Sequence, residues 1–251
     1  MDSKMKVVGL IPSRLNSSRL PQKPLIEIEG IPLVIHTYRR AKLSKKLDDV
    51  FICCDDKRIF NIAKKYNAKA ILTSSHHKNG TERICEAYLK SKKKFDLIID
   101  IQGDEPLISP YHIDRLIDYH KKNKLIDIVL PHLLVKNLNN PNIIKIVTDK
   151  KNNVLYLSRA QIPFEFKSNI KFIKKHLSII SFLPKALLNF SKSKKTNLEK
   201  IEDVELLRAL EIGLKIKTIK MNGDSFSVDV FEDLKKAKLK MKDDKIFKIY
   251  R

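Results

Sequence analysis

Cations and hydroxyls gather in one stretch near the start of the chain, between a strongly apolar run and the next predicted helix. Residues 11–25 read Ile-Pro-Ser-Arg-Leu-Asn-Ser-Ser-Arg-Leu-Pro-Gln-Lys-Pro-Leu and contain the cations Arg14, Arg19 and Lys23 and the hydroxyls Ser13, Ser17 and Ser18. In an open α/β sheet, ligands bind outside the carboxyl ends of the strands. A loop of this composition at that place predicts a polyphosphate site. The alternative is a solvated surface loop, which the backbone restriction by Pro12, Pro21 and Pro24 makes less attractive.

Two acidic segments, far apart in the sequence, are candidates for a metal site. Asp104 lies in Gln-Gly-Asp-Glu-Pro directly after the apolar run 97–101, and Asp229 precedes a predicted helix. Carboxylate oxygens suit Mg²⁺, which takes one or two of them together with substrate phosphates. Asp229 has the alternative role of a helix N-cap, and Glu105 is expected to be structural. Neither a Gly-x-Gly-x-x-Gly fingerprint nor a P-loop is present, so side chains must help to hold the phosphates.

The first half of the chain alternates predicted strands and helices. Strands are expected over 7–11, 50–54, 68–72 and 97–101, with helices over 32–43, 57–66 and 81–91. Strands joined through helices of this length require crossover connections, so a mostly parallel sheet flanked by helices is expected.

The second half is less regular, with strands in succession. A helix is expected over 110–122, strands over 126–131, 143–148, 154–158, 176–183 and 216–221, and helices over 201–213 and 230–241. Strands 143–148 and 154–158 are expected to form a hairpin. The fold class is therefore α/β with a mixed, mostly parallel sheet and an antiparallel subdomain for substrate or dimerisation. We expect one domain over 1–251, with a nucleotide-binding half (about 1–125), a substrate and dimer region (about 126–222) and a return to the core (about 223–251).

The net charge of +22 raises the alternative of a nucleic-acid-binding protein. Lysines far outnumber arginines and are spread along the chain, and there is no Trp to stack on single strands. A solvated basic surface is the better interpretation, so no nucleic-acid partner is expected.

Membrane insertion and disulfides are not expected either. No apolar run reaches the roughly 18–20 residues of a membrane span, and the first residues lack the apolar core of a signal peptide. Cys53, Cys54 and Cys85 are interpreted as reduced core residues. These features favour a cytoplasmic protein.

The motifs, taken in order, resemble those of the 3-deoxy-manno-octulosonate (Kdo) cytidylyltransferases, the CMP-Kdo synthetases of Gram-negative lipopolysaccharide assembly. The resemblance runs from about Val7 to Leu234. Beyond the loop 11–25 and Gln102–Pro106, it includes Asn79–Arg83, Asn140-Pro-Asn142 with Lys145, Ser158–Ala160 with Ile162-Pro163, His176, Glu205 with Leu207–Leu210, and Val228-Asp229 with Glu232–Leu234.

This resemblance implies a fold of the nucleotide-diphospho-sugar transferase type, usually a homodimer, and the conversion of CTP and Kdo into CMP-Kdo and pyrophosphate. Arg14, Lys23, Asp104 and Asp229 would be catalytic, with the two aspartates holding Mg²⁺. The nucleotide would also contact Ser18, Arg19, Arg83 and Gln102. Arg159, His176 and Glu205 would hold the sugar acid, for which a guanidinium fork suits the carboxylate. Without the resemblance, Arg159 could pair with an acid, His176 could be a satisfied core histidine, and Glu205 could form a surface pair with Arg208.

The departures from the family pattern concentrate on the acceptor side. Ile180 stands where the family has a tyrosine, Leu206 where it has a glutamine, and Val230-Phe231 where it has Thr-Pro. Gln22 replaces a frequent glycine in the nucleotide loop. Loss of two polar groups favours a less hydroxylated acceptor or a looser fit. An 8-amino-octulosonate, a nonulosonate such as a sialic, legionaminic or pseudaminic acid, and an inactive relative that keeps only the scaffold therefore remain alternatives.

Overall fold

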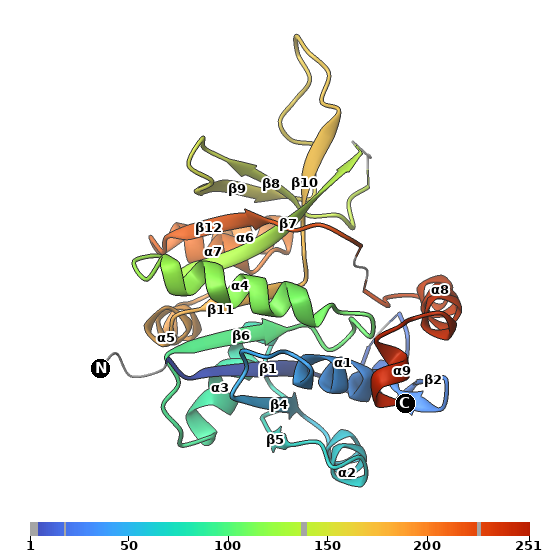
Figure 1. Ribbon diagram of the computed structural model, residues 1–251. Coiled ribbons are helices and arrows are strands. Elements are labelled where there is room, and N and C mark those ends of the chain that lie inside the picture. The colour runs from blue at the N-terminus through green and yellow to red at the C-terminus, as the bar shows by residue number, and fades with distance from the viewer. Residues whose placement is uncertain (1–4, 18, 137–139, 225–226) are drawn as a thin grey trace. The chain divides into compact units, whose positions relative to one another are not determined.

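The computed structural model describes residues 5–17, 19–136, 140–224 and 227–251. The chain divides into two compact units, residues 1–115 with 225–251 (unit 1) and residues 116–224 (unit 2). Parallel core strands flanked by helices, with antiparallel strands elsewhere, make an α/β fold with a mixed sheet, as the sequence predicts. Figure 1 labels the elements.

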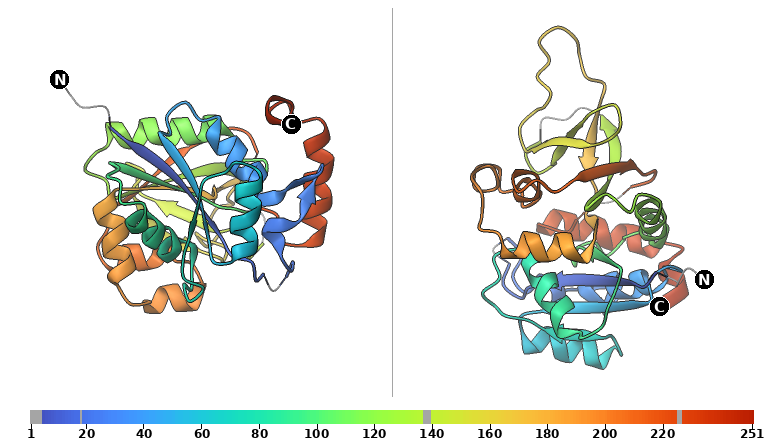
Figure 2. Two further views of the ribbon diagram at one scale, coloured as in Figure 1. Left: turned by 90° about the horizontal axis from the view of Figure 1, so that it is seen from below. Right: turned by 90° about the vertical axis from the view of Figure 1, so that its left-hand side faces the viewer.

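Unit 1 contains a parallel sheet in the order β5-β4-β1-β6. Its strands are β1 (Val7–Ser13), β4 (Asp49–Cys54), β5 (Ala70–Leu72) and β6 (Leu97–Ile101). The crossovers pass through α1 (Leu33–Lys42), α2 (Lys57–Lys65) and α3 (Gly80–Lys90). Because such crossovers are right-handed, the reversal of strand order places α3 on the opposite face from α1 and α2, as the left view of Figure 2 shows. All four strands and three helices predicted for this half are confirmed within a few residues.

Short elements complete unit 1. After β1 come the 3₁₀ helix η1 (Lys23–Leu25) and the small hairpin of β2 (Glu27–Ile28) and β3 (Ile31–Pro32). The chain returns at its end through α8 (Phe231–Lys242) and α9 (Phe247–Tyr250). Buried Arg40 on α1 fixes this return, since its Nη1 donates to Asp244 at 2.8 Å and its Nε to the Ile108 carbonyl at 2.6 Å.

Helix α4 (Pro110–Lys122) contains the boundary between the units, and unit 2 is built around the nine-residue strand β7 (Ile128–Lys136). Strand β7 pairs antiparallel with β10 (Phe172–His176) and β11 (Ile179–Phe182), and parallel with β12 (Ile216–Lys220). The predicted hairpin is confirmed as β8 (Lys145–Thr148) and β9 (Val154–Ser158). The helices of unit 2 are α5 (Pro184–Lys192), α6 (Asn197–Glu202) and α7 (Leu206–Glu211).

The structure of unit 2 differs from the sequence-based expectation in three places. The strand expected over 176–183 is shorter, β11 over Ile179–Phe182, and β10, which ends at His176 and pairs with another part of β7, is not predicted. The single helix expected over 201–213 is interrupted because Asp203 has φ 49°, a left-handed conformation that ends α6. Helix α5, which begins at Pro184, was not predicted.

Buried His36 on α1 makes the stability of unit 1 dependent on pH. Its Nε2 donates to the Ile28 carbonyl at 2.8 Å, so its Nδ1 accepts from the Tyr250 hydroxyl at 3.0 Å. Burial, aided by Arg40 and Arg39, lowers the pKa of His36 to about 4. The imidazole is therefore protonated below about pH 6.5 in the unfolded state, but only below about pH 4 in the native state. As the pH is lowered from about 6.5 to about 4, the protonation of this residue therefore decreases the free energy of unfolding by up to about 3 kcal/mol.

We therefore expect urea unfolding midpoints to decrease from pH 7 to pH 4.5. In His36→Gln, whose amide can replace both hydrogen bonds, this dependence should be weaker. An unchanged slope in His36→Gln would assign the effect to other groups.

Candidate active site

The carboxyl end of β1 is the point at which three loops of unit 1 meet. A Cβ on Gly103 would lie 2.6 Å from the Pro12 carbonyl oxygen, so only glycine allows the loop after β6 to approach so closely. A Cβ on Gly80, at the start of α3, would lie 3.3 Å from the Pro12 side chain. Three segments are thus neighbours: the loop 11–25 after β1, the Gln102–Pro106 motif after β6 and the Asn79–Arg83 motif at the start of α3.

Asp104 and Asp229 meet beside this point, although they are far apart in sequence. The Val228 amide donates to the Asp104 carbonyl at 2.9 Å and holds the two segments together. Lys23 Nζ lies 2.7 Å from Asp104 Oδ2 and 3.2 Å from Asp229 Oδ1, and Arg19 Nη2 lies 3.0 Å from Asp229 Oδ1. The carboxylates are 24% and 36% exposed, and the Lys23 side chain 15%. The result is a charge-balanced cluster of two carboxylates and two cations in unit 1.

The neighbouring acidic residues have other tasks. The N-cap alternative for Asp229 is wrong, because Val230 is the N-cap of α8 and the amides of both residues donate to Asp233. Glu105 is 2% exposed and accepts from the Ser227 hydroxyl at 3.3 Å, in keeping with the structural role predicted for it. Asp229 is therefore left to face Lys23 and Arg19.

The remaining groups of the β1 loop differ in their surroundings. Arg14 is exposed, and within the described part of the chain it has no ion pair. The Ser13 hydroxyl is buried and has no hydrogen-bond partner among the described residues, a feature that the sequence did not single out. Gln22, just before η1, has φ 53°. Ser18 lies outside the described residues.

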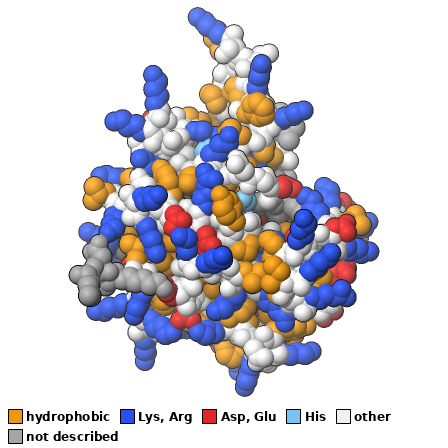
Figure 3. Space-filling model, viewed as in Figure 1, with side chains coloured by type: hydrophobic (Ala, Val, Ile, Leu, Met, Phe, Trp, Pro, Cys, Tyr) orange, Lys and Arg blue, Asp and Glu red, His pale blue; other side chains and the backbone are white. Residues whose placement is uncertain are grey.

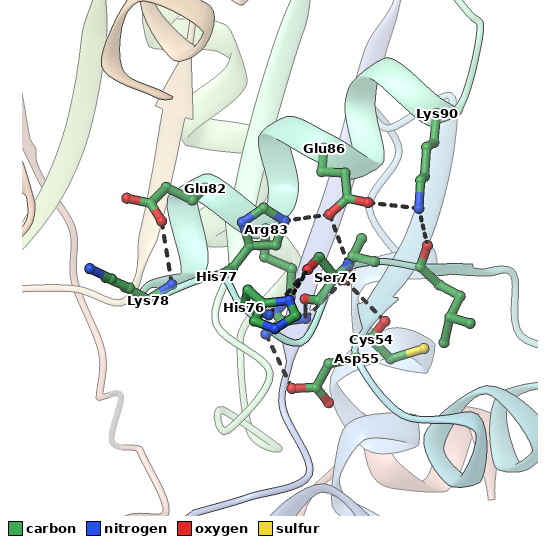
Figure 4. Close-up of polar contacts among 12 residues, drawn as sticks. Cys54, Asp55, Ser74, His76, His77, Lys78, Glu82, Arg83, Glu86 and Lys90 are labelled. Atoms are coloured by element: carbon green, nitrogen blue, oxygen red, sulfur yellow. Dashed lines mark hydrogen bonds and ion pairs between the residues drawn. The ribbon is translucent and has the colours of Figure 1, made fainter. Parts of the chain in front are cut away.

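Arg83 and Gln102 act inside unit 1. The Arg83 side chain is 4% exposed and donates to the Thr73 hydroxyl at 2.8 Å, the Ser74 carbonyl at 3.1 Å and Asp55 Oδ2 at 3.2 Å (Figure 4). Asp55 in turn accepts from the Leu15 amide at 3.0 Å. Gln102 Nε2 donates to buried Asp100 at 3.1 Å. Arg83 thus links the loop after β5 to the start of the loop after β1.

Glu86 on α3 holds the loop 73–79 from its other side (Figure 4). Its carboxylate accepts from the Ser74 amide at 2.8 Å and pairs with His77 and with Lys90. Burial would raise the pKa of Glu86, but these contacts outweigh it and lower the pKa to about 2. The loop is therefore anchored by a carboxylate that stays ionised at all physiological pH values.

The three predicted sugar contacts all belong to unit 2. Arg159, just after β9, donates to the carbonyls of Glu202 at 2.8 Å, Asp203 at 3.1 Å and Pro141 at 3.2 Å. The Glu202 carboxylate accepts from the Arg159 amide at 2.9 Å. The Arg159 guanidinium is therefore fixed by backbone carbonyls, two of them at the turn between α6 and α7 and one at Pro141, and not by an acidic side chain.

His176 and Glu205 have different settings in unit 2. His176, at the end of β10, pairs in register with His132 on β7, and its buried Nε2 has no hydrogen-bond partner among the described residues. Burial, with a contribution from Lys175, lowers the pKa of His176 to about 4, so the ring is neutral at pH 7. It is not the satisfied core histidine that was the alternative. Glu205 is half-buried at the start of α7.

Lys145 on β8 is a buried cation that the sequence presents only as part of a motif, without a role of its own. It is 1% exposed, and its ammonium donates to the carbonyls of Asn140 at 2.7 Å and Arg159 at 2.6 Å. Burial lowers its pKa. Lys145 thereby fixes the backbone of Arg159. This positioning role follows from its burial and its contacts, which the sequence does not reveal.

Positive charge is dispersed over the surface seen in Figure 3. On the face seen in Figure 3, Lys and Arg side chains are scattered and are not gathered into one stripe. Among the described residues no group of three or more His, Cys, Asp or Glu is arranged to hold a metal ion. Asp104 and Asp229 are therefore a pair of potential ligands and not a complete protein cage.

In the described part of the chain, no helix is long and apolar enough to cross a membrane.

Comparisons with known proteins agree on one family. The cytidylyltransferase family model matches residues 8–216. The 3-deoxy-manno-octulosonate cytidylyltransferase of Thermodesulfovibrio yellowstonii is 41% identical over 93% of this chain and 97% of its own length. The 8-amino-3,8-dideoxy-manno-octulosonate cytidylyltransferase of Shewanella pealeana is 39% identical over 92% and 96%. A solved CMP:2-keto-3-deoxy-manno-octonic acid synthetase complexed with CTP superposes with a TM-score of 0.90 at 30% identity, covering 94% of this chain and 98% of that one.

Proposed function

The chain belongs to the cytidylyltransferase family, and we propose that it transfers CMP from CTP to the anomeric hydroxyl of Kdo, with release of pyrophosphate, for lipopolysaccharide synthesis. The observation that carries this proposal is the convergence of Asp104 and Asp229 on the Lys23 ammonium, at 2.7 and 3.2 Å, beside the end of β1. Such a cluster provides both the carboxylates and the cations that a nucleoside triphosphate site needs.

The nucleotide contacts come from unit 1. Arg14, which is exposed, and Lys23 bind the triphosphate, with Arg19 beside them and Ser18 as a further hydroxyl of the same loop. The Ser13 hydroxyl, buried without a described partner, is an added candidate for a phosphate oxygen. Gln102 offers its amide beside this loop, and Arg83, already committed to Thr73, Ser74 and Asp55, acts by shaping the loop that faces the nucleotide.

The donor set of Asp104 and Asp229 fits Mg²⁺. Their oxygens already point to one cation, and two carboxylates plus substrate phosphates are a usual set for this ion. When bound there, Mg²⁺ would neutralise charge on the α-phosphate and lower the pKa of the attacking hydroxyl. No protein general base is needed in this scheme.

The chemistry is a displacement in which the sugar hydroxyl loses its proton to solvent, its oxygen forms a bond to the α-phosphorus, and the bond to pyrophosphate breaks. Catalysis of phosphoryl and nucleotidyl transfer depends mostly on positioning and charge neutralisation. Arg14 and Lys23 supply positive charge for the leaving pyrophosphate. The absence of a side chain at Gly103 lets the Asp104 loop lie directly against Pro12 near the end of β1.

The sugar acid is bound by residues of unit 2. The Arg159 guanidinium uses one hydrogen on each of its nitrogens for protein carbonyls, which leaves two for a carboxylate. His176 Nε2 and the Glu205 carboxylate are further polar contacts. Lys145 and Glu202 hold the Arg159 backbone in place.

An 8-amino-octulosonate is the second candidate acceptor. The positions that lack polar groups, Ile180 and Leu206, are 4% and 3% exposed and offer no hydrogen bond to a sugar hydroxyl. Relatives named for the two sugars differ by only two percentage points in identity, 41% against 39%. The choice between the two sugars therefore rests on measurement of both.

Pyrophosphate release with Mg²⁺ tests this function directly. CTP with Kdo should give turnover, and UTP or ATP should give much less. Parallel kcat/KM values with 8-amino-Kdo and with nonulosonates identify the acceptor, and equal or better turnover of Kdo removes the amino-sugar candidate. Absence of pyrophosphate with every sugar, or preference for UTP or ATP, would refute the proposal.

The protein is further proposed to be a homodimer that works in the cytoplasm, where CTP is available. Unit 2 carries Phe164 and Phe166, each 82% exposed, and Phe172, 57% exposed, on or beside β10. Aromatic side chains are enriched at protein interfaces. Sedimentation should therefore show about twice the chain mass of 29.1 kDa, and Phe164→Ser with Phe166→Ser should shift the protein towards the monomer.

A further inference from the structure

The Lys23 ammonium lies where a divalent cation would have to lie. It is within 2.7 Å of Asp104 Oδ2 and 3.2 Å of Asp229 Oδ1, and Arg19 Nη2 shares the same Asp229 oxygen at 3.0 Å. The two negative charges of the aspartates are therefore already balanced by two positive charges. A divalent ion placed between those two oxygens would occupy the space that the ammonium fills.

We propose that Lys23 holds the metal position in the nucleotide-free protein and is exchanged for the divalent cation when CTP enters, so that metal and nucleotide bind with positive coupling. This inference rests on the proposed function for the identity of the nucleotide. Like charges repel at such distances, so Lys23 must leave Asp104 before the ion can be fully coordinated.

The construction of the β1 loop allows this exchange without rebuilding the backbone. The turn around Lys23 is fixed by the hydrogen bonds Lys23 N to Leu20 O at 3.2 Å and Ile26 N to Lys23 O at 3.2 Å. The Lys23 side chain, by contrast, is a flexible four-carbon stem that is partly exposed. Rotation of the side chain alone can therefore move the ammonium from the carboxylates to a phosphate.

The coupling follows from where the displaced charge goes. Without nucleotide, release of Lys23 costs the ion pair to Asp104 and leaves the ammonium beside a divalent ion. With CTP bound, the triphosphate accepts Lys23 and offers oxygens to the ion. The nucleotide must then raise the metal affinity, and by linkage the metal raises the nucleotide affinity by the same factor.

Mn²⁺ binding to the free protein, measured by the electron paramagnetic resonance signal of unbound Mn²⁺, tests the exchange. Titrations with and without CTP, in the absence of any sugar, compare wild type with Lys23→Met and with Lys23→Gln. The control Lys57→Met removes one exposed positive charge from the start of α2, where Lys57 forms no ion pair with any described residue. Thermal melts with and without Mn²⁺ check that each variant is folded.

Without CTP, Lys23→Met should bind Mn²⁺ at least tenfold more tightly than wild type, and Lys57→Met should match wild type. The gain in Mn²⁺ affinity on adding CTP should be large in wild type and small in both Lys23 variants. Equal or weaker Mn²⁺ binding by folded Lys23→Met and Lys23→Gln, without CTP, overturns the exchange. Because these titrations need no turnover, an enzyme that releases no pyrophosphate refutes the proposed function and leaves this result to be judged separately.

Discussion

Asp104→Asn is expected to lower kcat by roughly a thousandfold or more, since it removes one of the two anionic groups that we propose as ligands of the metal. Asparagine has the same shape and keeps one oxygen, so the hydrogen bond from Lys23 and the backbone bond from Val228 can persist. The loss should therefore come from chemistry and not from the fold. Asp229→Asn should behave in the same way.

The measurement is single-turnover pyrophosphate release at saturating CTP, Kdo and Mg²⁺. Asp243→Asn is the matched control, because Asp243 is an exposed acid beyond α8 and loses the same charge from the same unit. Melting temperatures near that of wild type would show that the variants are folded. A rate within a few-fold of wild type for Asp104→Asn or Asp229→Asn would remove that residue from the metal site.

Most of unit 1 could be predicted because its central strands β1, β4 and β6 are almost entirely buried. Val7, Val8, Leu10 and Ile11 are at most 1% exposed, so β1 appears in the sequence as an uninterrupted apolar run. The loops after β1 and β6 then meet because the carboxyl ends of adjacent parallel strands share one edge of the sheet. Sequence order alone therefore brought Lys23 and Asp104 into one hypothesis.

What could not be predicted depends on contacts between distant residues or on single backbone angles. The left-handed conformation of Asp203, which divides α6 from α7, has no strong signal in the sequence, because aspartate is common in helices and turns alike. The location of the Lys23 ammonium between Asp104 and Asp229 also required coordinates. The same holds for the left-handed backbone of Gln22, with φ of 53°, a conformation that glycine adopts at less cost.

The second large effect is expected on stability, from the buried ion pair of Arg208 and Glu199 in unit 2. Both side chains are 2% exposed, and Arg208 Nε and Nη2 each lie 2.7 Å from a different oxygen of Glu199. The guanidinium also stacks 4.3 Å from the centre of the Phe190 ring and donates to the Ser193 carbonyl. The contact thus ties α5, α6 and α7 together, and Arg208 is a core residue and not the surface residue that its spacing from Glu205 suggested.

Arg208→Met should lower the free energy of unfolding by roughly 3–5 kcal/mol, because it leaves the Glu199 carboxylate buried without its partner. Urea titration followed by circular dichroism measures the loss. The turn between α6 and α7 also holds Arg159 through Glu202, so KM for the sugar acid should rise while KM for CTP changes little.

The double variant Arg208→Met with Glu199→Leu separates the cost of an unpaired charge from the value of the ion pair itself. Replacing a buried pair by apolar side chains of similar size is often neutral or stabilising, whereas removing one partner is not. Recovery of most of the lost stability in the double variant would show that the carboxylate left in the core causes the loss. If the double variant were as unstable as Arg208→Met, the pair would be needed for its geometry, through the Phe190 and Ser193 contacts that only the guanidinium can make. A single variant as stable as wild type would contradict the assignment of this pair as the main polar contact among α5, α6 and α7.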